Sequence, residues 1–134
     1  MDYKDLLRKR AKRKFGKNPQ LRLRVYDKIK SLLSNSMTSN QVINKLLARK
    51  KPSDLYTKPD AAFLNHVSIS YRKGYSFSEA LRGWATPGEI MLIRSGEESG
   101  RLNESLERTI DMLNKMIEMR NRVKSEITYP IVLF

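Results

Sequence analysis

Apolar residues recur every three or four positions along most of the chain, which is the spacing of amphipathic α-helices rather than of strands. The first series follows Asn18-Pro19, a helix start signal because Asn can cap a helix and Pro is tolerated at the first helical position. A second series follows Thr38-Ser39 and ends before Pro52. The apolar positions of the two series are Leu21, Val25, Ile29, Leu32 and Leu33, then Val42, Ile43, Leu46 and Leu47.

The second half of the chain continues in the same way. The pattern predicts a helix from Pro59 that stops at Gly74, and a short helix capped by Ser76 or Ser78. A further helix opens at Thr86-Pro87 and is expected to end at Gly96. The longest helix is predicted over about residues 101–129, with two apolar stripes: Leu102, Leu106, Ile110, Leu113 and Ile117, then Met112, Met116, Met119, Val123 and Ile127. We therefore predict an all-α fold, an antiparallel bundle of about six helices over residues 19–129.

The charge of the chain is concentrated at its beginning. Of 134 residues, 27 are Lys or Arg and 14 are Asp or Glu, which gives a net charge of +13. Residues 1–30 carry a net +9, whereas residues 59–134 are neutral. We predict that residues 1–18 are a flexible basic arm that meets an anionic partner: lipid headgroups, an acidic protein or nucleic acid. The cations of its densest part are Arg8, Lys9, Arg10, Lys12, Arg13, Lys14 and Lys17.

The sequence contains few residues that could form a catalytic site. Cysteine is absent, which excludes thiol nucleophiles and disulfides, and the single histidine, His66, is typical of a packing residue. The segment from Arg94 to Leu102 is the most unusual, because two glycines bracket two carboxylates and two serines. We interpret it as a tight turn between helices, with Glu97 and Glu98 near the start of the second helix. A weaker alternative is a divalent-cation site formed by Glu97, Glu98 and Glu104, although their spacing matches no EF-hand loop.

The end of the chain is apolar. The last five residues, 130–134, carry no charge, and five residues cannot span a bilayer, which needs roughly 20. We expect residues 130–134 to be the start of a truncated transmembrane segment. The basic region upstream then predicts that residues 19–129 are a cytoplasmic domain.

Two segments of the chain have recognisable patterns. Gly74-Tyr75-Ser76-Phe77-Ser78-Glu79-Ala80-Leu81 is similar to "G-x-S-L-x-x-A-L". Ile93 to Leu102 is similar to "I-x-x-G-E-x-S-G-x-L", and the helix that follows leads into Tyr129-Pro130. These segments resemble signatures of the type II secretion F-protein family, the inner-membrane platform proteins of type II secretion and type IV pilus machines, in which the long helix ends in "Y-P". The resemblance covers roughly residues 20–134; its motif residues are Gly74, Pro87, Gly96, Glu97, Ser99, Gly100, Leu102, Tyr129 and Pro130. Ser36-Met37-Thr38 departs from the family, which usually has Gly in its first hairpin turn.

The resemblance implies a non-enzymatic domain on the cytoplasmic side of the bacterial inner membrane. It implies as partners the cytoplasmic assembly ATPase, other inner-membrane pilus or secretion proteins and a second copy of the domain. It implies no cofactor, apart from a divalent ion that some members bind. The basic arm is not part of the shared pattern. The alternative hypothesis is a basic helical nucleic-acid-binding protein, which the neutral body of the chain disfavours.

Overall fold

The structure is a computed structural model that describes the backbone of residues 2–133 and the side chains of residues 2–123. The described part is entirely helical, which confirms the all-α prediction, and two of its eight helices are single turns. The helices are α1 (Tyr3–Lys17), α2 (Pro19–Leu33), α3 (Ser39–Ala48), α4 (Asp54–Thr57), α5 (Pro59–Arg72), α6 (Phe77–Ala80), α7 (Pro87–Ser99) and α8 (Leu102–Leu133).

Short polar residues set the helix starts. The Asn18 side chain accepts a hydrogen bond from the Leu21 N–H and so caps α2. Thr38 and Thr86 open α3 and α7 with capping boxes, in which the residue three positions on bonds back to the cap. These caps satisfy N–H groups that a helix leaves without partners, so the loops between helices can be short.

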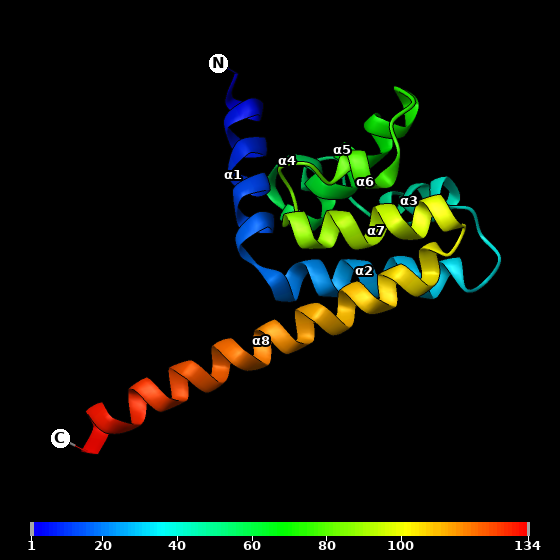
Figure 1. Ribbon diagram of the computed structural model, residues 1–134. Helices are drawn as coiled ribbons and strands as arrows, with labels where there is room; N and C mark the ends of the chain where they lie inside the picture. The colour runs from blue at the N-terminus through cyan, green and yellow to red at the C-terminus, as the bar shows by residue number, and fades with distance from the viewer. Residues whose placement is uncertain (1, 134) are drawn as a thin grey trace.

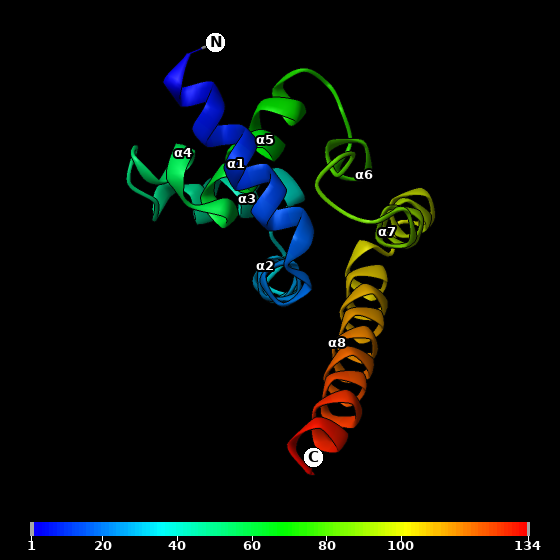
Figure 2. The ribbon, with the colours of Figure 1, turned by 90° about the vertical axis from the view of Figure 1, so that its left-hand side faces the viewer.

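The helices form two groups with a shared core. Figure 2 shows α1, α3, α4 and α5 on one side and α6, α7 and α8 on the other. α8 packs against α7 and α2 and then extends well beyond the bundle (Figure 1). Its far end lies at the lower left of Figure 1, on the same side as α1 but away from the N-terminal end of α1, which is at the top.

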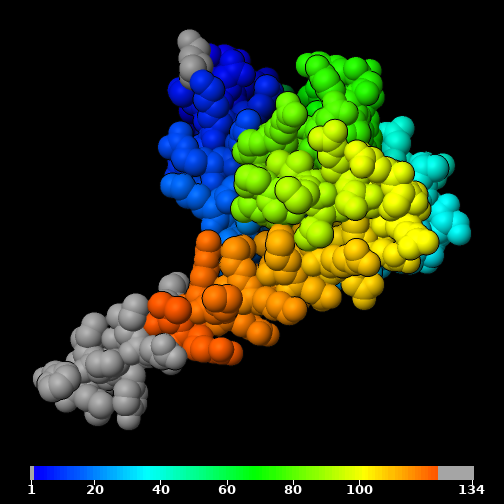
Figure 3. Space-filling view, viewed as in Figure 1, coloured from blue at the N-terminus to red at the C-terminus, as the bar shows by residue number. Residues whose placement is uncertain are grey.

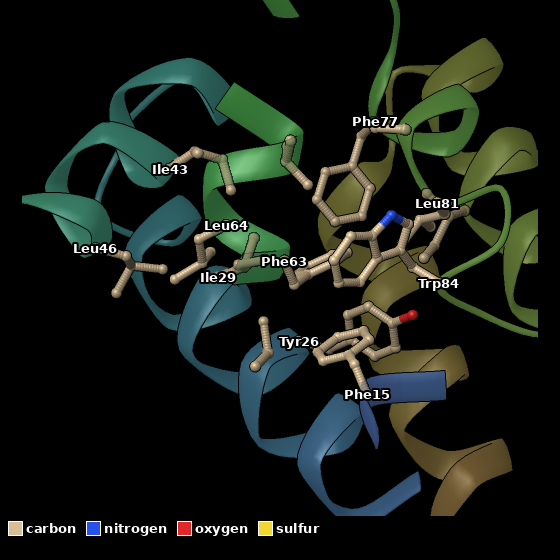
Figure 4. Packing of buried hydrophobic residues seen from close by; sticks show 14 of the residues in the cluster. Phe15, Tyr26, Ile29, Ile43, Leu46, Phe63, Leu64, Phe77, Leu81 and Trp84 are labelled. Carbon is tan, nitrogen blue, oxygen red and sulfur yellow. The ribbon is translucent and has the colours of Figure 1, made fainter. Parts of the chain in front are cut away.

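Aromatic side chains occupy the centre of the core (Figure 4). The rings of Phe15 and Phe63 stack with centroids 4.3 Å apart. Trp84 lies 5.8 Å from each of them and is only 2 % exposed. Phe77 meets the edge of Phe63 at 6.4 Å. Such pairs contribute about 0.5–1.5 kcal/mol each beyond the burial of their apolar area, so α1, α5 and the α6–α7 segment are held together at one point.

The basic segment corrects one prediction. We expected residues 1–18 to form a flexible arm, but residues 3–17 form α1, whose Ala11 and Phe15 are fully buried. The run of like charges led us to expect repulsion along the segment. That repulsion is offset because one face of the helix is apolar and the cations spread over its other sides.

The end of α7 corrects another. Gly96, expected to end the helix, lies inside α7, which continues to Ser99 and stops at Gly100. Glu97 and Glu98 therefore belong to the last turn of α7 and not to the start of the next helix. At the other end of α8 the backbone runs through Tyr129 and Pro130. The predicted start of a membrane segment at residues 130–134 falls outside the described side chains.

Candidate interaction surfaces

The signature turn between α7 and α8 depends on two glycines in different ways. Gly100 has a left-handed backbone, with φ of 71°. Its N–H donates to the Glu97 carbonyl at 3.4 Å, and the Arg101 N–H donates to the Gly96 carbonyl at 2.7 Å. These two bonds form a Schellman motif. Gly96 is buried because α8 crosses it closely: a Cβ there would collide with the Ser105 side chain and lie 3.0 Å from the Arg101 carbonyl.

The other signature segment contains a turn of the same kind. Gly74 ends α5 with φ of 88°, and the Tyr75 N–H donates to the Ser70 carbonyl at 3.0 Å. Two residues later Ser76 caps α6. The two segments are joined directly, because the Ser78 N–H donates to the Glu97 carboxylate at 2.6 Å. The motif residues therefore form one polar junction between α5, α6, α7 and α8.

Of the remaining motif residues, Ser99 and Leu102 lie at this junction, whereas Pro87 begins α7 at its other end. Ser99 is exposed, and its hydroxyl donates to the Ser95 carbonyl at 3.0 Å. Leu102 is half-buried and begins α8. Pro87 is the exposed first residue of α7. Near the junction the Ser39 and Tyr71 hydroxyls are 2.5 Å apart, and burial raises the pKa of Tyr71 to about 12. Tyr129 and Pro130 lie beyond the described side chains.

The three carboxylates of the weaker cation hypothesis have separate partners. Glu97 accepts from Ser78, whereas Glu98 pairs with Arg94 across 3.2 Å on the exposed side of α7. Glu104 is exposed in the first turn of α8. In the part of the chain with described side chains, no group of three acidic, His or Cys residues could hold a metal ion.

A buried ionic network connects α1, α2 and α7. The Arg22 guanidinium donates to Glu89 at 2.8 Å, and the two residues are 2 % and 0 % exposed. Arg22 also donates to the carbonyls of Phe15 and Gly16 at the end of α1, at 3.0 and 2.7 Å. Tyr26 donates to the same carboxylate at 2.9 Å. Burial, followed by the charge of Glu89, raises the Tyr26 pKa well above its usual 10.

Sequence reasoning missed this network. Glu89 stands three residues after Thr86, which is a capping-box signal, and the box is present: the second Glu89 oxygen accepts from the Thr86 N–H and hydroxyl at 3.0 and 2.7 Å. A capping Glu is usually exposed, however. Nothing in the pattern shows that an Arg 67 residues earlier would be buried against it.

His66 lies on α5 beside Trp84, and the two rings stack with centroids 5.0 Å apart. Its Nε2 is 2.8 Å from the Ala80 carbonyl. A carbonyl only accepts, so the neutral ring carries its proton on Nε2. Burial lowers the pKa of His66 below 6.5, although the bond to Ala80 acts in the opposite direction. This arrangement fits the packing role that the sequence predicted.

The cations of the basic segment are distributed unevenly around α1. Lys12 is half-buried, with its ammonium 5.7 Å from the centre of the Trp84 ring. Arg8 lies 5.5 Å from the Tyr56 ring and pairs with Asp5. Arg8 is exposed, and so are the other cations of the segment: Lys9, Arg10, Arg13, Lys14 and Lys17.

Comparison with known proteins agrees with the signatures. The model of the family described as "Type II secretion system (T2SS), protein F" matches residues 26–134. The chain belongs to this family. The family match excludes α1 and the first half of α2.

Three curated relatives resemble this member of the F-protein family. The type IV pilus assembly protein PilC of Thermus thermophilus is 36 % identical over 73 residues, which are 53 % of this chain and 18 % of the relative. The protein transport protein HofC homolog of Escherichia coli is 29 % identical over 112 residues, 81 % of this chain and 27 % of the relative. The type 4 fimbrial assembly protein PilC of Pseudomonas putida is 29 % identical over 76 residues, 54 % and 19 % of the two chains.

The family member described here therefore spans less than a third of each of these relatives. Their names concern pilus assembly and protein transport, and the hypothesis of a nucleic-acid-binding protein gains no support from them. Within the described residues, no helix combines the length and hydropathy needed to cross a bilayer.

Proposed function

We propose that this chain is a non-enzymatic cytoplasmic domain of an inner-membrane platform protein for type IV pilus assembly or type II secretion. In this role it is a scaffold that docks the assembly ATPase, contacts other machine proteins and associates with a second copy of itself. The observation that carries the proposal is the family match over residues 26–134, together with relatives named for pilus assembly and protein transport.

The exposed side of α7 is the surface we propose for the ATPase. Met91 is 72 % exposed, and Arg94, Ser95 and Glu98 lie around it. The opposite side of the helix, with Ile93 and Gly96, is buried against the bundle. A large apolar side chain within a polar rim is the usual composition of a protein contact centre. α7 lies on the face of the molecule that is seen in Figure 3.

Binding of the 134-residue chain to the assembly ATPase of its own machine tests this proposal. We expect Met91→Asp to weaken the complex about tenfold or more, because a charge replaces a central apolar contact. Met119→Asp is the matched control, since Met119 is a 63 % exposed methionine on α8. Equal effects of the two substitutions would contradict the proposal that the ATPase binds the exposed side of α7. No binding of the ATPase by the unaltered chain would contradict the docking role.

A second measurement concerns the machine itself. Met91→Asp in the full-length platform protein should reduce pilus assembly or secretion in cells at normal protein abundance, whereas Met119→Asp should not. Sedimentation of the purified chain over a range of concentrations tests self-association. A monomer at all concentrations would contradict that part of the proposal.

A further inference from the structure

The side of α1 that faces away from the core has an unusual composition. Tyr3, Leu6, Arg10, Arg13 and Lys17 follow one another at intervals of three or four residues, so they form one stripe, which we name the outer stripe. All five are exposed, and Tyr3 and Leu6 are 72 % and 52 % exposed. The opposite side of the helix carries the buried Ala11 and Phe15.

The three cations of the outer stripe have no acidic partner among the described residues. Arg8 pairs with Asp5 on another side of α1. Beside Lys17 the cationic surface continues into a pocket of about 470 Å³, where Lys14 and Arg120 of α8 also lie. None of the described residues that line this pocket carries a carboxylate. From Arg10 to Arg120 the surface is therefore cationic and attracts anions.

We infer that the outer stripe of α1 docks onto the anionic phospholipid headgroups of a bilayer. A helix that lies on a membrane surface combines cations, which meet the headgroups, with apolar and aromatic side chains, which enter the boundary of the acyl region. Tyr3 and Leu6 are the aromatic and apolar side chains of the outer stripe. Such side chains gain nothing from contact with a nucleic-acid backbone. Nucleic acid would be bound by the cations alone.

The inference also bears on how the domain sits at the bilayer. α1 lies on the left of Figure 1 and in front in Figure 2, with its N-terminal end pointing away from the far end of α8. The inference rests on the proposed function, because it supposes that α8 leads to the membrane. Because the core holds α1 through Phe15, lipid contact by the outer stripe would fix the orientation of the whole domain relative to the bilayer.

Vesicle flotation of the 134-residue chain tests the inference. The vesicles are phosphatidylcholine, either pure or with one third phosphatidylglycerol, and we expect binding to the anionic ones only. The triple variant Arg10→Gln, Arg13→Gln, Lys17→Gln should bind roughly one hundredfold more weakly at low salt, at about fivefold for each cation. The control triple Lys45→Gln, Arg72→Gln, Arg101→Gln removes the same charge from exposed positions elsewhere and should bind within a few-fold of the unaltered chain.

Insertion can be followed separately because the chain has no cysteine. An environment-sensitive dye on Leu6→Cys should shift to shorter emission wavelengths when anionic vesicles are added. The same dye on Met91→Cys should not shift, although Met91 is even more exposed. This readout does not depend on the folding of the triple variant.

Equal loss in the two triple variants, or equal dye shifts at positions 6 and 91, would overturn the assignment to the outer stripe. Tight binding to duplex DNA with none to anionic vesicles would overturn the lipid assignment in favour of nucleic acid. If lipid binding fails while the ATPase still binds, only this inference is lost. If the ATPase fails to bind while the stripe docks to lipid, only the docking role is lost.

Discussion

The two glycines of the α7–α8 turn differ in backbone conformation, so substitution should affect them for different reasons. Ala inside a helix is normally favoured over Gly by about 1 kcal/mol. At Gly96 we expect the opposite sign, a loss of about 1–3 kcal/mol, because the new Cβ collides with Ser105 of α8. Gly100→Ala should cost about 1 kcal/mol for its left-handed φ alone, since a Cβ there meets nothing within 4 Å.

Urea denaturation measures both losses, and a second substitution separates their causes. Ser105→Gly removes the colliding atoms and should restore part of the stability of Gly96→Ala but none of that of Gly100→Ala. If Ser105→Gly rescues neither variant or both equally, the close approach of α7 and α8 at Gly96 is not the cause.

Among the described residues, Ser36 is the one residue other than glycine with a left-handed backbone. Its φ is 65°, in the turn between α2 and α3. We predict that Ser36→Gly stabilises the domain by about 0.5–1 kcal/mol, because glycine adopts this conformation without steric cost. Ser31→Gly within α2 is the control and should destabilise by a similar amount. Thermal unfolding of the two variants should shift in opposite directions; a loss of stability in Ser36→Gly would contradict the prediction.

At the scale of elements, the buried Arg22–Glu89 pair joins α2 to α7, and Arg22 also bonds to the end of α1. Arg22→Met should cost about 3–5 kcal/mol, because Glu89 would remain as a buried charge without its partner. Arg22→Met combined with Glu89→Gln should cost clearly less than the sum of the single changes. A double-mutant cycle by chemical denaturation measures this coupling, and additive losses would show that the pair contributes no net interaction.

The packing of α5 on Trp84 predicts a pH dependence. Because burial lowers the folded-state pKa of His66 below the unfolded value of 6.5, the unfolded chain binds the proton more tightly. The contribution of the neutral His66 ring to stability is therefore fully present above pH 6.5. It is lost as the pH falls through the folded-state pKa. The carboxyl of Asp60 does not titrate in this pH range. Burial raises its pKa, but the hydrogen bond and the charge of Lys50 lower it by more, so that its pKa lies below 3.8. His66→Gln should abolish the decline of melting temperature between pH 7 and pH 5, and an unchanged decline would assign it elsewhere.

Local pattern predicted most of the helices, but not α1 or the single turn α4, and it did not predict the contacts between helices. Caps such as Thr86 and the left-handed Gly74 act within a few residues, so the sequence predicts them. The partner of Glu89 is 67 residues away, and the close approach at Gly96 depends on the crossing of two helices. Such features depend on tertiary packing, which periodicity does not encode. The residues of the two signatures were recognisable in the sequence, yet their hydrogen bond through Glu97 and Ser78 appears only in the fold.

For the whole molecule, the central question is whether α1 is part of the domain, since the family match begins only at residue 26. Phe15 is fully buried, stacks on Phe63 and contacts the edge of Trp84. We predict that Phe15→Ala lowers the free energy of unfolding by about 3–5 kcal/mol. Removal of residues 1–17 should destabilise the domain at least as much, because it also takes the Phe15 and Gly16 carbonyls from Arg22.

The single tryptophan of the chain reports this directly, because Trp84 is buried against Phe15. Its emission should move to longer wavelengths in the truncated chain, as water reaches the core, and the melting temperature should fall. The Arg10→Gln, Arg13→Gln, Lys17→Gln variant is the matched control, since it neutralises the exposed side of α1 and leaves Phe15 in place. If the truncated chain keeps the emission and melting temperature of the full chain, α1 is dispensable to the core, and the predicted flexible arm would describe it better than a packed helix.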